Sequence, residues 1–135
     1  MAATAVVDTG FLVALVRRRD RHHAWAVRQA EHFATPWHTC ESVLSEAFYV
    51  IPAHGWRALI GLLERGAVTA SFDFSANRSA VLGIMRKYAD LPVSLADACL
   101  VRMSELLPDP VVLTTDLDFG VYRRNNRQVV PVEMP

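Results

Sequence analysis

The chain has 135 residues, 52% of them hydrophobic, and its 14 Lys and Arg residues balance 14 Asp and Glu residues. This size predicts one domain, residues 1–135, with a sizeable core, and the zero net charge excludes a global field that attracts nucleic acid. Two cysteines are too few for a disulfide framework, and the longest N-terminal apolar stretch, residues 11–16, is too short to span a membrane, so we expect a soluble, cytoplasmic protein.

The predicted elements alternate between strands and helices. In chain order they are a strand at residues 5–7, a helix at 11–16, a helix ending at 33, a strand at 36–38, helices at 40–51 and 55–64, a strand at 68–72, helices at 75–88 and 95–107, a strand from 111, and a strand at 128–132. The expected N-terminal caps are Asp20, Thr39, Ser75 and Ser94. Strands that alternate with helices need crossover connections, so we predict a single three-layer α/β domain, a mainly parallel sheet flanked by helices.

Two of the predicted strands end in aspartate. The apolar, β-branched run that begins at Val111 stops at two carboxylates, Asp116 and Asp118, which is typical of a buried parallel strand that ends in a polar crevice. Asp8 follows the first strand in the same way, although an aspartate there also suits the N-cap of the next helix. Because ligands of open α/β sheets bind at the carboxyl ends of the strands, these acids are predicted to face one site.

Two further acids lie on predicted helices. Asp97 is in the first turn of the helix at 95–107, outside its apolar stripe, where a surface carboxylate would also be favourable to the helix dipole. Glu46 lies on one border of the apolar face of the helix at 40–51, and Glu41 lies on the other border. The two glutamates cannot easily point into one site, and an ordinary solvated glutamate remains an alternative for either.

Taken together, four acids make a chemically coherent set: Asp8, Glu46, Asp97 and Asp116. Carboxylates that are brought close together in a crevice of low dielectric constant repel one another, so such a cluster normally binds a hard cation. Oxygen ligands with few histidines suit Mg²⁺ or Mn²⁺ better than zinc. The usual work of a pair of such ions is in-line displacement at phosphorus.

Four segments match a known pattern in order, spacing and total chain length: Val6-Val7-Asp8-Thr9-Gly10-Phe11-Leu12, Val43-Leu44-Ser45-Glu46-Ala47, Leu95-Ala96-Asp97-Ala98-Cys99-Leu100 and Leu113-Thr114-Thr115-Asp116-Leu117-Asp118-Phe119. With these segments the chain resembles the PIN-domain ribonucleases, particularly the VapC-type toxins of bacterial toxin–antitoxin systems. The resemblance implies a parallel sheet flanked by helices, an acidic site that holds Mg²⁺ or Mn²⁺, and endonucleolytic cleavage of RNA. In the toxins it also implies a cognate antitoxin, and we expect a homodimer.

Carried over by position, the catalytic and metal-binding acids are Asp8, Glu46, Asp97 and Asp116. Asp118 is a fifth candidate and competes with Asp116 at the sheet edge, while Thr9 or Thr115 would orient a metal-bound water. The mechanism we expect is hydrolysis by a water molecule that the metal activates, and the sequence leaves open which acid holds a second ion.

Thirteen of the fourteen basic residues are arginine, which favours bidentate phosphate contacts, and most of them fall in two groups. The candidate contacts to the RNA backbone are Arg17, Arg19, Arg123 and Arg124. Two solvated surface patches are an alternative of about equal weight.

Other functions are open to consideration. Asp8-Thr9-Gly10 is also the signature tripeptide of aspartic proteases, but those proteins are β-rich, whereas here the tripeptide leads into a helix of an α/β pattern. Asp116-Leu117-Asp118 is similar to the paired aspartates of phosphotransferases, but it lies too near the C-terminus. The serious alternative is a catalytically inactive PIN-like module that binds RNA or protein. The five histidines show no metal-ligand spacing, and Trp25, Trp37 and Trp56 are expected to pack in the core or an interface.

Overall fold

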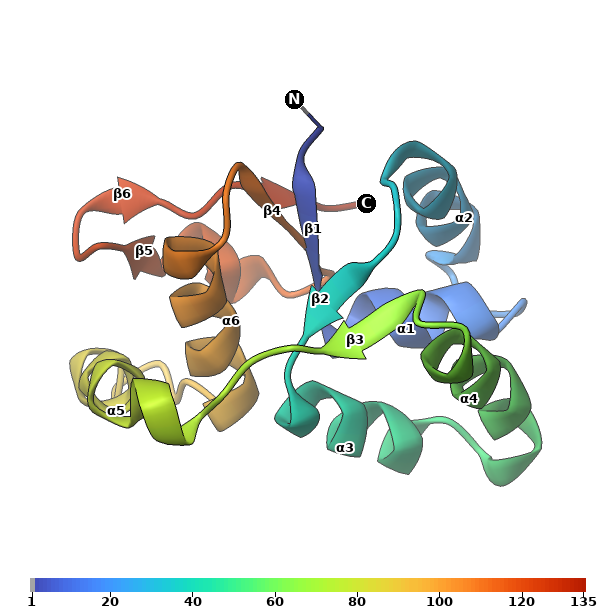
Figure 1. Ribbon diagram of the computed structural model, residues 1–135, viewed down its shortest axis with the longest axis horizontal. Helices are drawn as coiled ribbons and strands as arrows, with labels where there is room; N and C mark the ends of the chain where they lie inside the picture. Colours follow the sequence, from blue (N-terminus) through green and yellow to red (C-terminus); the bar gives the residue numbers. More distant parts are fainter. Residues whose placement is uncertain (1) are drawn as a thin grey trace.

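The computed structural model describes residues 2–135, and its centre is a parallel sheet of five strands in the order β3-β2-β1-β4-β7 (Figure 1). The strands are β1 (Thr4–Val7), β2 (Trp37–Thr39), β3 (Val68–Ala70), β4 (Pro110–Leu113) and β7 (Val132–Glu133). The α-helices of the described chain are α1 (Thr9–Val16), α2 (His23–His32), α3 (Glu41–Val50), α4 (Trp56–Glu64), α5 (Arg78–Lys87) and α6 (Leu95–Leu106). The predicted α/β fold with a parallel sheet is confirmed.

The strand order places a topological switch point between β1 and β4. The chain moves outward from β1 to β2 and β3, and then returns to the opposite side of β1 with β4. Val7 pairs with Leu113, and the peptide nitrogen of Asp8 donates to the carbonyl of Leu113 at 3.0 Å, which continues the ladder beyond β1. The carboxyl ends of the first and fourth strands therefore lie side by side, where open α/β sheets bind ligands.

The helices cover both faces of the sheet. In Figure 1, α5 and α6 lie on one side of the strands, and α1, α2 and α4 lie on the other. Helix α3 packs against both α1 and α6, and it therefore lies beside the end of the sheet at which β1 ends. Among residues 2–135 no helix combines the length and the apolar character that a membrane crossing needs.

Aromatic side chains fill the core between α1, α2 and the sheet. Phe11 contacts Trp25 and Trp37 edge to face, with ring centroids 5.9 Å and 5.5 Å apart. Both tryptophans are buried, as the sequence predicted, whereas Trp56 on α4 stays partly exposed. Edge-to-face pairs of this kind add stability beyond the area that they bury, so α1 is firmly fixed behind the switch point.

Three of the four predicted helix caps are wrong. The hydroxyl of Thr39 donates to the carbonyl of Val7 at 2.8 Å, and it thereby ties β2 to β1 instead of capping α3. Asp20 accepts from His22 but lies before the start of α2. The peptide nitrogen of Ala76 donates to Asp73, and the residues from Ser75 to Asn77 form a separate 3₁₀ turn, η2. Only Ser94 acts as predicted, because its hydroxyl accepts from the peptide nitrogen of Asp97 at 3.0 Å.

The C-terminal region also differs from the prediction of one strand at 128–132. Residues there divide between β7 and a short hairpin, in which β5 (Arg123–Arg124) pairs antiparallel with β6 (Gln128–Val129). Asn125 and Asn126 form the turn at φ values of 50° and 66°. Asparagine tolerates this left-handed conformation and is favoured in tight hairpin turns. The predicted strand itself is divided between β6 and β7 at Pro131, which has no peptide N–H to donate to a ladder.

Candidate active site

Asp8 lies at the end of β1 and is almost completely buried, with 6% of its surface exposed. Its Oδ1 accepts from the peptide nitrogen of Thr9 at 2.7 Å, and its Oδ2 accepts from the hydroxyl of Thr114 at 2.6 Å. The pKa of Asp8 is raised to about 6, mainly by burial and to a smaller extent by the charges of Asp97 and Asp116, while these two hydrogen bonds act in the opposite direction. Asp8 is therefore both the N-cap of α1 and a buried acid of the site.

Thr114 joins the two strand ends. Its hydroxyl is fully buried, donates to Asp8, and accepts from the peptide nitrogen of Asp116 at 3.0 Å. Thr9 and Thr115 were the threonines expected to act at the site, and Thr114 was not among them. A local signal was present, because threonine hydroxyls after a strand commonly bond to the main chain two residues on, as Thr114 does with Asp116.

Thr9 and Thr115 have other contacts. The hydroxyl of Thr9 donates to Oε2 of Glu46 at 3.0 Å, which links the start of α1 to α3. Thr115 lies against Gly10, where an added Cβ would come within 2.1 Å of the threonine Oγ1. Only glycine lets the loop after β4 approach α1 so closely.

Asp97 is buried in the first turn of α6, with 9% of its surface exposed, so its interpretation as a surface carboxylate is wrong. Its Oδ2 accepts from the phenol of Tyr122 at 3.0 Å. Burial raises the pKa of Asp97, and the charge of Asp116 acts in the same direction. Tyr122 was not among the residues expected from the sequence, because no spacing rule joins it to a residue 25 positions earlier.

The two aspartates after β4, Asp116 and Asp118, differ in their electrostatic surroundings. Asp116 is half-buried, and its Oδ1 accepts from the peptide nitrogen of Asp118 at the start of η3 (Leu117–Gly120). The charge of Asp116 raises the pKa of both Asp8 and Asp97, whereas the charge of Asp118 does not contribute to either shift. Electrostatic coupling thus groups Asp116, rather than Asp118, with the two buried acids.

Glu46 completes the predicted set from a different environment. It is exposed on α3, and it accepts a hydrogen bond from the hydroxyl of Thr9. Since Thr9 directly follows Asp8, this bond brings Glu46 to the same end of the sheet. The structure therefore brings three acids into mutual electrostatic range and places Glu46 at the same end of the sheet.

The donor chemistry of this site fits a hard divalent cation. Across residues 2–135, no three His, Cys, Asp or Glu side chains lie close enough together to enclose a metal ion by themselves. Mg²⁺, however, usually keeps several of its waters and needs only one or two carboxylates from the protein. A bound cation stabilises the charged form of carboxylates that raise one another's pKa. All four acids carry the oxygen donors that Mg²⁺ and Mn²⁺ prefer.

The two groups of arginines differ in their contacts. Arg17, Arg18 and Arg19 are exposed and line a surface cavity of about 220 Å³, together with His54 and apolar residues. By contrast, Arg123 donates through Nη1 to the carbonyls of residues 120, 121 and 122, and Arg124 donates through Nη2 to the carbonyl of Ser104. The first group is available to a ligand, whereas the second group supports the C-terminal hairpin.

A parallel sheet with acids gathered at its switch point defines an α/β protein with a carboxylate-rich candidate active site. The family model of the PIN domain matches residues 5–125, and the chain belongs to the PIN-domain family. PIN domains are generally nucleases that act on RNA, and they typically bind divalent metal ions. No curated protein sequence matches the chain.

Proposed function

We propose that this PIN domain is a metal-dependent endoribonuclease that hydrolyses RNA phosphodiester bonds and serves as the toxin of a type II toxin–antitoxin pair. The observation that carries the nuclease proposal is the electrostatic grouping of Asp8, Asp97 and Asp116 at the switch point of a PIN-domain sheet. The toxin role rests on the resemblance to VapC-type proteins. The proposed cofactor is Mg²⁺ or Mn²⁺.

Asp8, Asp97 and Asp116 would hold the metal, with Glu46 beside them and Asp118 as a further candidate. When bound, the ion would make a coordinated water more acidic and offset the charge that develops at phosphorus. Thr114 keeps Asp8 in one orientation through its 2.6 Å hydrogen bond. Glu46 would accept a proton at its carboxylate, a role that its exposure and its hydrogen bond from Thr9 support.

For the RNA backbone we propose Arg17 and Arg19 as the principal contacts. Their guanidinium groups are exposed at the end of α1, the helix whose other end carries Asp8, and an eight-residue helix is about 12 Å long. Arg123 and Arg124 become secondary candidates, because one guanidinium nitrogen of each is engaged with main-chain carbonyls. Replacing both Arg17 and Arg19 by Ala should weaken RNA binding and lower the salt dependence of the binding constant, with a slope change of about 0.7 per lost contact. An unchanged slope would argue against these contacts.

The proposed protein partners are a second copy of the chain and a cognate antitoxin. Exposed apolar side chains on the outer surface of α3 and α4 support an interface of this kind, since Tyr49 is 90% exposed and Ile60 is 41% exposed. Light scattering of the purified chain, with Tyr49→Ser as a variant, tests the homodimer, because a monomer at micromolar concentration contradicts it.

The decisive experiment measures cleavage of a single-stranded RNA in Mn²⁺. We expect EDTA to abolish cleavage, and Asp97→Asn to reduce it by about 100-fold or more, because a ligand that stabilises the transition state is lost. Glu41→Gln is the matched control, since Glu41 is an exposed acid on α3 outside the site. Wild-type cleavage by a pure, folded Asp97→Asn protein would contradict the proposal.

The alternative is a PIN-like module that binds RNA or protein without cleaving. Calorimetric titration with Mn²⁺ separates the two functions. A catalytic site should bind the ion, and a degenerate site should bind it weakly or not at all. Only the second result, together with RNA binding, favours the module.

A further inference from the structure

We propose that Tyr122 is a positioning residue, which holds the Asp97 carboxylate in the orientation that metal binding requires. This inference rests on the proposed metal-dependent function of the site. The phenol of Tyr122 donates to Oδ2 of Asp97 at 3.0 Å, from a side chain that is fully buried. Because a buried hydroxyl requires a partner, this bond is a fixed feature of the folded chain.

The ring of Tyr122 is held on two sides. Phe119 of η3 packs against it edge to face, with ring centroids 5.2 Å apart, and Tyr88 at the end of α5 packs at 5.1 Å. These contacts leave the ring little freedom to turn. The hydroxyl is therefore placed by packing, and the carboxylate of Asp97 adjusts to it.

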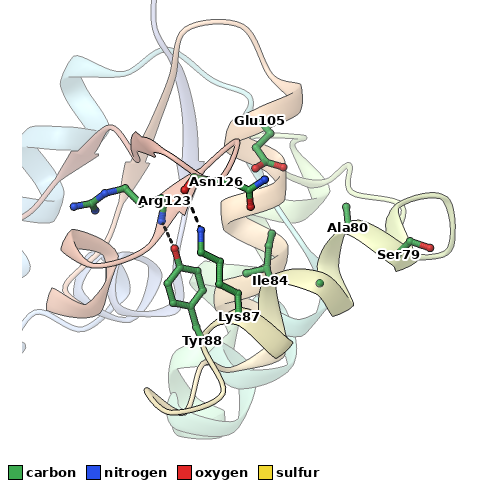
Figure 2. Close-up of a pocket in the computed structure, with 9 residues that line it drawn as sticks. Ser79, Ala80, Ile84, Lys87, Tyr88, Glu105, Arg123 and Asn126 are labelled. Carbon is green, nitrogen blue, oxygen red and sulfur yellow. Dashed lines mark hydrogen bonds between the residues drawn. The ribbon is translucent and has the colours of Figure 1, made fainter.

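The main chain around Tyr122 is also fixed. The hydroxyl of Tyr88 accepts from the peptide nitrogen of Arg123 at 2.9 Å, and Nζ of Lys87 donates to the carbonyl of Asn126 at 3.0 Å. Figure 2 shows both side chains reaching from α5 to the hairpin. Since Arg123 directly follows Tyr122, these bonds anchor the backbone that carries the phenol.

A buried carboxylate with one fixed oxygen presents the rest of the group in a defined direction. Groups that hydrogen-bond to a ligand carboxylate orient it, and their loss commonly weakens metal affinity by about 10- to 100-fold. Thr114 holds Asp8 in the same manner from the other side of the site. Tyr122 thus orients Asp97 in the same way that Thr114 orients Asp8.

The test compares Tyr122→Phe with Tyr88→Phe by calorimetric titration with Mn²⁺. Both variants remove a buried phenol hydroxyl and keep the ring, but only Tyr122 contacts an acid of the site. We expect Tyr122→Phe to weaken Mn²⁺ binding by about 10-fold or more, and Tyr88→Phe, which removes only an indirect support of the phenol, to weaken it clearly less. Thermal unfolding in EDTA measures the stability of both variants independently of the metal.

p-Aminophenylalanine at position 122 keeps the ring and a donor, so it should restore Mn²⁺ affinity. p-Methylphenylalanine fills the space of the hydroxyl without a donor, and it replaces the phenylalanine variant if that protein does not fold. Wild-type affinity in folded Tyr122→Phe, or equal losses in the two phenylalanine variants, would overturn the inference. A wild-type protein that binds Mn²⁺ but leaves RNA intact contradicts the ribonuclease function alone. A wild-type protein without Mn²⁺ affinity overturns both.

Discussion

The buried and exposed acids of the site illustrate two ways of placing a carboxylate. Asp8 and Asp97 are withdrawn from water, and each is held by a hydroxyl from a distant part of the chain. Glu46 stays in solvent on α3 with one hydrogen bond. Burial of a charge costs free energy that hydrogen bonds only partly offset. The buried pair is therefore rigid and electrostatically destabilised, whereas the exposed acid is neither.

This difference is expected of a site that binds a cation. A chain without such a function would gain stability by replacing a buried, self-repelling pair of acids with neutral side chains. Local rules of stability are commonly broken at functional sites. Substitution of a buried acid should consequently change both stability and activity more than substitution of the exposed acid.

The largest effect is expected for Asp8→Asn. Cleavage should fall by about 100-fold or more, as for Asp97, because a proposed metal ligand is lost. In EDTA at pH 7 the same variant should be more stable than the wild type, by at most about 3 kcal/mol, because the buried charge is gone. Urea unfolding measures the stability, and a less stable variant at pH 7 would contradict the electrostatic explanation.

The raised pKa of Asp8 also determines how the stability of the protein depends on pH. The pKa of Asp8 in the folded protein, about 6, lies above its ordinary value of 3.8. Between these values the folded state holds more protons than the unfolded state, so this group makes the wild type lose stability as pH rises from about 4 to 6. The stability difference between wild type and Asp8→Asn should shrink as the pH falls through this range.

An intermediate effect is expected for Thr114→Val. This change removes the hydroxyl that serves both Asp8 and the peptide nitrogen of Asp116, and it leaves those buried groups without a partner. The expected loss is about 1–3 kcal/mol in the free energy of unfolding, measured in urea. Thr114→Ser keeps the hydroxyl and should retain the Mn²⁺ affinity that Thr114→Val loses. Equal affinities in the two variants would show that the hydroxyl does not position Asp8.

The smallest effect on stability is expected for Glu46→Gln, within about 0.5 kcal/mol of the wild type, because the side chain is exposed. Its cleavage rate should fall by about 10-fold, less than in the buried variants, since solvent can take over part of its role. Kinetics beside Glu41→Gln measure this difference. A loss of cleavage as large as that of Asp97→Asn would show that the exposed acid contributes as much to activity as the buried acids, which contradicts this prediction.

Local sequence signals predicted the strands and helices that carry the site. The apolar runs before Asp8 and Asp116 were recognisable as strands, and Ser94 as the cap of the helix that carries Asp97. Caps failed where a tertiary partner was stronger, as at Thr39, whose hydroxyl bonds to the neighbouring strand. A local propensity describes only the competition within a few residues, and contacts across the sheet can override it.

The sequence by itself determined the order of the elements and the types of acid at their ends, because periodicity, chain breaks and side-chain chemistry are local properties. Only the tertiary structure decided which of these acids are buried and what holds them. The Thr114–Asp8 bond joins residues 106 positions apart, and the Tyr122–Asp97 bond depends on how the hairpin packs against α5 and α6. Such contacts are set by the pairing of β1 with β4 and by the packing of whole helices, which no spacing along the chain contains.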